Sequence, residues 1–184
     1  MATNVTQTLV DEHRLILRMI ALLEQNAPRT AAGQYTNWQF YLDGIDFIRQ
    51  YADRFHHAKE EDVLFEALVA NGMPREHSPV AAMLMEHDQG RAFVKGLEEA
   101  VREAQAGRTG SYQAIADNAL GYADLLKDHI AKEDGVLYPL AERVLPEEMR
   151  QGILQGYQTA ELQAPESFGR HYQSVVELYE EESR

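Results

Sequence analysis

A motif that occurs twice limits how this chain can fold. Residues 56–65 and 129–138 share the pattern His-x-x-Lys-Glu-x-x-Val-Leu followed by an aromatic residue. On an α-helix, side chains four residues apart lie on one face, one turn from each other. The repeat therefore predicts two equivalent helices, each with a His and a Glu that could bind one metal ion together. These pairs are His56 with Glu60 and His129 with Glu133.

Apolar residues with a helical period continue on both sides of each copy and predict four helices. Glycine, proline and an N-capping serine separate them, and the first helix is expected to end before Pro28. The apolar faces include Leu17 in the first helix and Val136 in the fourth, and no β-type alternation is present. Because proline removes a backbone donor, Pro139 should kink or end the fourth helix shortly after the motif. The predicted helices cover residues 8–25, 37–71, 78–106 and, after a cap at Thr109 or Ser111, a segment to about Leu140.

The first and third predicted helices also correspond to each other. Each carries a single histidine four residues after an apolar residue, His13 after Leu9 and His87 after Met83. The chain therefore repeats a unit of two helices. Two such units joined by short turns predict an all-α fold, an up-down-up-down four-helix bundle with pseudo-twofold symmetry.

Two shorter helices are predicted after this bundle, one beginning near Pro146 and one after Pro165. We expect residues 1–145 to form a metal-binding four-helix bundle and residues 146–184 to form a C-terminal helical extension. The extension could pack on the bundle, cover the mouth of the metal site or form a dimer contact. The chain is thus expected to be a monomer or a homodimer.

Composition excludes several classes of function. The chain has no cysteine, so disulfides, thiolate zinc sites and thiol catalysis are excluded. A formal net charge of -13 repels phosphate backbones and anionic lipids, so neither nucleic acid nor a membrane surface is an expected partner. Because no segment has the length and apolar content of a membrane span and no secretion signal is present, we expect a cytoplasmic protein.

The inward faces of the four predicted helices carry six candidate metal ligands. Unpaired, these buried imidazoles and carboxylates would each cost several kcal/mol of desolvation, which a marginally stable domain cannot absorb in number. A mixed imidazole and carboxylate set suits iron first, with manganese or zinc as alternatives. The six residues are His13, His56, Glu60, His87, His129 and Glu133.

Neighbouring residues leave alternatives open. His57 and Glu61 also stand four apart, but on an α-helix they are rotated by about 100° from the line of His56 and Glu60. His57 could be an auxiliary ligand or a hydrogen-bond donor to the site, and Glu61 is expected to be a surface charge. Glu12 and Glu86 precede the single histidines and could orient imidazole rings or be solvated surface acids.

The arrangement of a single His, His-x-x-x-Glu, a single His and a second His-x-x-x-Glu resembles the hemerythrin-like (HHE cation-binding) domain over residues 5–145. The resemblance implies a four-helix bundle with two iron ions in a non-haem di-iron centre. It also implies binding or sensing of a small ligand such as dioxygen, nitric oxide or peroxide. Family members also include enzymes that reduce peroxide or nitric oxide and proteins of iron handling or iron-sulfur repair, so whether this chain is an enzyme stays open.

One position departs from the pattern of the oxygen-carrying hemerythrins. These have two histidines one turn apart on the third helix, whereas here Met83 stands four residues before His87. Solvent, His57, a glutamate or a tyrosine could fill the position that this methionine leaves without a ligand.

Overall fold

The structure is a computed structural model that describes residues 3–183, and these residues form helices and connecting turns without a strand. The prediction of an all-α fold is confirmed. The first long helix is α1, Gln7–Ala31. The second helical path begins with α2 and continues through two π-helical segments into α3. The bounds are α2 Trp38–Phe47, η1 Ile48–His57, η2 Glu60–Leu64 and α3 Phe65–Ala70.

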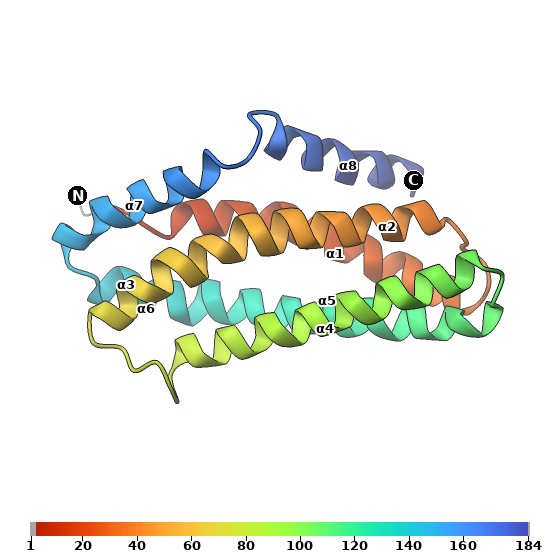
Figure 1. Cartoon of the computed structure of the whole chain (residues 1–184), viewed down its shortest axis with the longest axis horizontal. Helices are drawn as coiled ribbons and strands as arrows, with labels where there is room; N and C mark the ends of the chain where they lie inside the picture. The colour runs from red at the N-terminus through yellow and green to blue at the C-terminus, as the bar shows by residue number, and fades with distance from the viewer. Residues whose placement is uncertain (1–2, 184) are drawn as a thin grey trace.

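The second half of the chain repeats this course. Helix α4 is followed by a 3-10 turn, and α5 then continues through a π-helical segment into α6. These elements lie lengthwise beside α1 and α2, with α4 and α5 next to each other (Figure 1). The bounds are α4 Pro79–Gln105, η3 Thr109–Ser111, α5 Tyr112–Lys132, η4 Glu133–Leu137 and α6 Tyr138–Val144.

Local capping signals account for two of the helix starts. Asn37 accepts a hydrogen bond from the backbone N–H of Phe40, and Ser78 accepts one from Ala81, at 3.2 Å in each case. Both are the side-chain caps that satisfy the free N–H groups of a first helical turn. Pro79 follows Ser78 at the start of α4, where a missing N–H costs nothing.

The prediction for Pro28 is wrong. Helix α1 does not end before Pro28 but continues to Ala31, because Ala27 and Thr30 are buried against the bundle while Pro28 faces solvent. Pro139 was expected to kink or end the fourth helix shortly after the motif, and the helix ends five residues after it, at Val144. Pro139 lies in the first turn of α6, directly after the π-helical segment η4.

The π-helical segments η2 and η4 begin at the two glutamates of the repeated motif. The N–H of Phe65 bonds to the carbonyl of Glu60, and the N–H of Tyr138 bonds to that of Glu133, five residues back in each case. Such turns are rare and occur often at functional sites. The motif contains no signal for them, because its spacing also fits an ordinary α-helix.

The apolar interior is divided into two clusters. One is built on Ile16, Phe40 and Leu126, and the other on Leu9, Leu64 and Leu137. Along each of the four helical paths, the predicted His and Glu residues lie between the two clusters. The polar site is therefore a buried layer with apolar packing at both ends.

The extension consists of α7, Glu147–Glu161, and α8, Phe168–Glu182, which run along one side of the bundle (Figure 1). Tyr157 of α7 packs in one apolar cluster and Tyr172 of α8 in the other. Gly156 of α7 lies against Val63, so close that a Cβ there would come within 2.7 Å of the valine. The equivalent residue of the second copy, Val136, has no such cover.

Two residues that were predicted to be buried are exposed. Leu17 is 37% exposed and Val136 is 60% exposed, although both were placed on buried faces. Each lies at the edge of an apolar stripe that no neighbouring helix covers.

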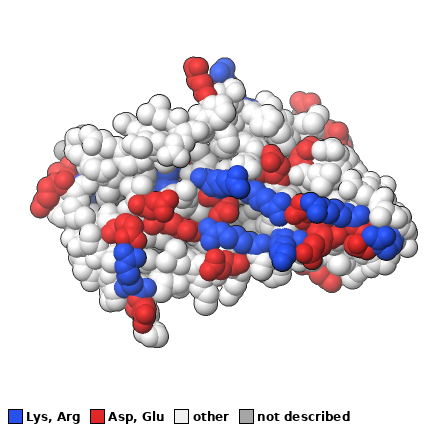
Figure 2. Space-filling model, in the orientation of Figure 1, with Lys and Arg blue, Asp and Glu red and all other residues white. Residues whose placement is uncertain are grey.

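The surface carries mixed charge. Figure 2 shows Lys and Arg interleaved with Asp and Glu on one face. Ion pairs of the chain include Arg49 with Glu98 and Arg91 with Asp53. Over residues 3–183, no helix combines the length and the apolar character needed to span a membrane.

Candidate metal centre

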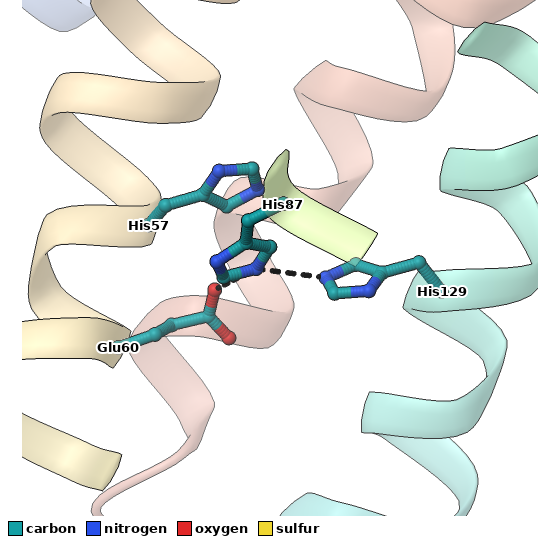
Figure 3. A group of neighbouring side chains, drawn as sticks. All are labelled: His57, Glu60, His87 and His129. Carbon is teal, nitrogen blue, oxygen red and sulfur yellow. Dashed lines mark hydrogen bonds and ion pairs between the residues drawn. The ribbon is translucent and has the colours of Figure 1, made fainter. Parts of the chain in front are cut away.

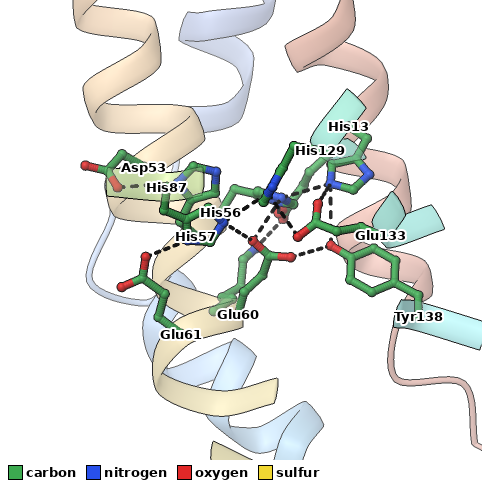
Figure 4. Close-up of polar contacts among 12 residues, drawn as sticks. His13, Asp53, His56, His57, Glu60, Glu61, His87, His129, Glu133 and Tyr138 are labelled. Carbon is green, nitrogen blue, oxygen red and sulfur yellow. Dashed lines mark hydrogen bonds and ion pairs between the residues drawn. The ribbon is translucent and has the colours of Figure 1, made fainter. Parts of the chain in front are cut away.

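The six residues predicted from the repeat lie together in the buried polar layer (Figure 4). His13 and His56 face each other with their Nε2 atoms 3.0 Å apart. His87 and His129 do the same at 3.1 Å. The layer thus contains two pairs of imidazoles, one from each repeated unit.

The two glutamates lie between these pairs. Oε2 of Glu60 is 3.6 Å from Nε2 of His56 and 3.5 Å from Nε2 of His87. Glu133 places Oε2 at 3.3 Å from Nε2 of His13 and Oε1 at 3.1 Å from Nε2 of His129. Each carboxylate therefore reaches both histidine pairs, which is the geometry of a group that can bridge two ions.

A carboxylate oxygen holds the outer nitrogen of every one of these four rings. The partner comes from another helix in each case, and the distances from Nδ1 to oxygen are 2.7–2.9 Å. A carboxylate on Nδ1 fixes the ring so that the Nε2 lone pair points inward, as metal-binding imidazoles require. The pairs are His13 with Asp134, His56 with Glu12, His87 with Glu61 and His129 with Glu86.

The structure distinguishes the two roles considered for Glu12 and Glu86, and it corrects the one expected for Glu61. Glu12 is buried and Glu86 is mostly buried, so they are orienting groups and not solvated surface acids. The assignment of Glu61 as a surface charge is wrong, because Glu61 contacts both His87 and Arg91. Asp134 was not considered, although its place after Glu133 matches that of Glu61 after Glu60 in the repeat.

Tyr138 is a further residue of the layer that the sequence analysis did not single out. Its hydroxyl donates to Oε1 of Glu60 at 2.5 Å and lies 3.4 Å from Nε2 of His13. Its ring stacks on that of His13, with centroids 5.6 Å apart. The signal was the aromatic position at the end of the motif, where the first copy has Phe65, stacked near His87 at 6.1 Å.

His57 also lies at the site, with only 6% of its surface exposed. Its ring stacks on that of His87 at a centroid distance of 3.7 Å (Figure 3). Ligand atoms of His57, Glu60, His87 and His129 lie within 4.8 Å of one another. On an ideal α-helix His57 was expected to be rotated away from His56 and Glu60, but its ring lies at the site.

The donor atoms of the layer fit a cation. With Nδ1 protonated on each ring, the facing Nε2 atoms present lone pairs to each other at about 3 Å, which is repulsive unless a proton or a metal ion lies between them. Oε2 of Glu60 and both oxygens of Glu133 are buried and accept no hydrogen bond. Buried carboxylate oxygens without partners are costly unless a positive charge compensates them.

Burial and neighbouring charges shift the pKa values of the layer in both directions. Burial, together with the charge of Glu133, raises the pKa of Glu60 well above its usual value. Burial and the neighbouring His13 and His57 hold the pKa of His56 well below its usual value, which favours the neutral form that binds metals. Burial opposes protonation of His13, but Asp134 and Glu133 outweigh it and raise its pKa to about 9. A metal ion would therefore displace a proton there.

The extension is connected to one half of the layer through a buried lysine. Lys59 is fully buried and donates both to Glu12, which orients His56, and to Glu161 of α7, at 3.1 Å from the latter. The matching residue of the second copy, Lys132, pairs with Glu86 but its side chain is 44% exposed. The extension therefore buries the motif lysine of the first copy and leaves that of the second copy partly exposed.

A small cavity of about 90 Å³ adjoins the His87–His129 half of the layer. Asp53, His57, His87 and Gly90 line it, together with Tyr122, whose buried hydroxyl has no hydrogen-bond partner. Two larger surface hollows, of about 580 and 450 Å³, lie beside Phe55 and the connection between α7 and α8. None of the six predicted ligands lines these hollows.

The sequence was compared with known proteins. It is 22% identical over 139 residues to Uncharacterized protein Mb2018 of Mycobacterium bovis and to Uncharacterized protein Rv1995 of Mycobacterium tuberculosis. The match covers 76% of this chain and 54% of each relative, so the chain spans about half the length of these curated relatives. No solved structure matches. Residues 4–141 match the hemerythrin HHE cation binding domain. The chain therefore belongs to the hemerythrin HHE cation-binding domain family.

Proposed function

We propose that this protein holds two iron ions in the buried layer and binds a small ligand there, such as dioxygen, nitric oxide or peroxide. The observation that carries the proposal is the electron-rich interior of the layer, in which facing Nε2 atoms and unpartnered carboxylate oxygens converge. Mixed nitrogen and oxygen donors suit iron, with manganese or zinc as alternatives. The proposed ligands are His13, His56, Glu60, His87, His129 and Glu133.

In this proposal each residue type has a separate task. The four imidazoles would bind through Nε2, and the carboxylates on their Nδ1 atoms would hold the rings in place. Glu60 and Glu133 would span the two halves, because each lies within 3.6 Å of an imidazole in both. Bound iron would supply redox chemistry and Lewis acidity. The apolar clusters on both sides would limit access of water.

Metal content tests the proposal. Protein expressed with iron and purified without a nickel column should contain about two iron ions per chain and show a near-ultraviolet charge-transfer band. His129→Ala should lower the iron content, whereas His171→Ala, at an exposed histidine, should not. Well under one metal ion per chain in the unsubstituted protein would refute the proposal.

A second candidate function is an enzyme that reduces peroxide or nitric oxide with electrons from an external donor. Tyr138 favours it, because its hydroxyl touches the layer and burial raises its pKa well above the usual value, which keeps a proton at that atom. Steady-state consumption of peroxide or nitric oxide with a reductant, lost in Tyr138→Phe without loss of iron, would support the enzyme. Binding without turnover would support the carrier or sensor.

Other expectations remain part of this proposal. We place the metal site in an up-down-up-down bundle of residues 1–145, with residues 146–184 as an extension of that bundle. The protein is proposed to be cytoplasmic, to be a monomer or homodimer and to bind neither nucleic acid nor a membrane. Sedimentation of the native protein would test the oligomeric state, and cell fractionation would test the cytoplasmic location.

A further inference from the structure

The orientation of His57 follows the rule that the four other histidines of the layer obey. Each of those rings has a carboxylate oxygen beside Nδ1, and His57 has Oδ1 of Asp53 at 3.4 Å from its Nδ1. This contact is not aligned well enough to be a hydrogen bond, and Nδ1 has no other partner. A ring nitrogen of His57 also lies within 4.8 Å of ligand atoms of Glu60, His87 and His129.

The repeat shows that packing alone does not require a histidine at this position. The residue that corresponds to His57 in the second copy is Ile130, which is 4% exposed and belongs to an apolar cluster. Burying an imidazole without a hydrogen bond where an isoleucine fits costs free energy. A ligand bound by the ring would offset that cost.

The backbone differs between the copies at the same place. Residues Ile48–His57 form the π-helical segment η1, whereas the corresponding residues 121–130 belong to the α-helix α5. In α5 the neighbours His129 and Ile130 are both buried, with Ile130 in an apolar cluster. In the wider turn, both His56 and His57 are buried at the layer. The rare winding thus coincides with the additional histidine.

We propose that His57 is a third nitrogen ligand of the His87–His129 half of the centre. This rests on the proposed metal function and extends it. The half built on His13 and His56 then keeps two nitrogen ligands and has the Tyr138 hydroxyl beside it, while the other half has three nitrogen ligands. The two metal ions consequently differ in donor set and in affinity.

The test compares His57→Ile with His77→Ala in metal-free full-length protein. Isoleucine is the residue of the second copy, and His77 is an exposed histidine outside the site. Both variants and the unsubstituted protein are titrated with Zn²⁺ against a chelator, after circular dichroism has verified that they are folded. Because loss of groups that only orient ligands already costs about 10–100-fold in metal affinity, we expect His57→Ile to weaken one of the two zinc sites by at least about tenfold. His77→Ala should leave both sites unchanged.

A zinc-loaded crystal of the unsubstituted protein gives a second, independent readout. We expect Nε2 of His57 at about 2.1 Å from the ion that His87 and His129 bind. If His57→Ile does not fold, the distance from His57 to the ion tests the role of His57 by itself. If His57→Ile binds two zinc ions with unchanged affinities, the role of His57 is overturned and the metal function stays intact. The same holds if the crystal shows two zinc ions with His57 beyond bonding distance. A protein that binds no zinc would overturn both.

Discussion

Replacing the buried Lys59 by methionine should destabilise the metal-free protein, although the lysine is not a proposed ligand. Its ammonium donates to Glu12 and Glu161 and lies 3.9 Å from the centre of the Phe55 ring. Methionine fills similar space but leaves Glu12 without its cationic partner. Burial already raises the pKa of Glu12 to about 7 against the opposing charge of Lys59, so the variant should take up a proton at Glu12 near neutral pH.

The size of the effect follows from the burial of this ion pair. Removing one partner of a buried pair costs about 3–5 kcal/mol, and we expect the lower end because protonation relieves the charge left on Glu12. The contact with Glu161 adds little, since that side chain is 40% exposed. For a chain of this size, about 3 kcal/mol corresponds to a decrease in Tm of roughly 6–12 °C.

The second copy of the motif provides the matched control. Lys132→Met removes the equivalent lysine, whose side chain is 44% exposed, and exposed pairs contribute about 0–1 kcal/mol. Its Tm should therefore fall by no more than about 4 °C. Both variants are measured by calorimetry on metal-free protein in the presence of a chelator at pH 7.5. Equal shifts in the two variants would show that α7 does not make the two halves of the layer different.

Three further predictions concern other parts of the molecule. Burial raises the pKa of Tyr41 to about 12 against its hydrogen bond with Thr30. Since the unfolded chain ionises near pH 10, stability should be retained below pH 10 and lost between pH 10 and 12. Urea midpoints should fall less steeply over this range in Tyr41→Phe, and an unchanged slope would contradict the assignment. Gly156→Ala should loosen α7, because its Cβ would come within 2.7 Å of Val63, whereas Gly152→Ala, with open space around it, should stabilise the helix by about 0.5–1 kcal/mol. Proteolysis of the extension distinguishes the two variants, and equal protection in both would refute the close contact. Glu12→Gln and Glu86→Gln should each weaken metal binding by about 10–100-fold without removing a ligand. Chelator competition measures the loss, and full affinity in both variants would mean that these carboxylates do not orient their rings.

Much of the site could be predicted because the signal is local. The spacing of His56 and Glu60 determines that they share a helix face, and the second copy selects this register over that of His57 and Glu61. The apolar period then places the single histidines on the same interior. Six residues from four helices were identified in this way, and the structure gathers them in one buried layer.

The remaining features depend on contacts between helices that are distant in the sequence. Each imidazole receives its carboxylate from another helix, such as Glu12 of α1 for His56 and Asp134 of η4 for His13. The order and rotation of the packed helices decide these pairs, and no spacing within one helix encodes them. The π-helical winding of Ile48–His57 likewise has no signal in the spacing of the sequence.

The sequence by itself determined an all-helical chain with a repeated His and Glu motif, because helical periodicity and four-residue spacing are local properties of the backbone. Only the tertiary structure decided that the two copies are not equivalent. In the first copy, α7 packs against Val63, and Glu161 of α7 pairs with the buried Lys59. In the second copy, Val136 and Lys132 remain exposed. A repeat in the sequence predicts equal halves, but the extension covers these motif residues in the first copy alone.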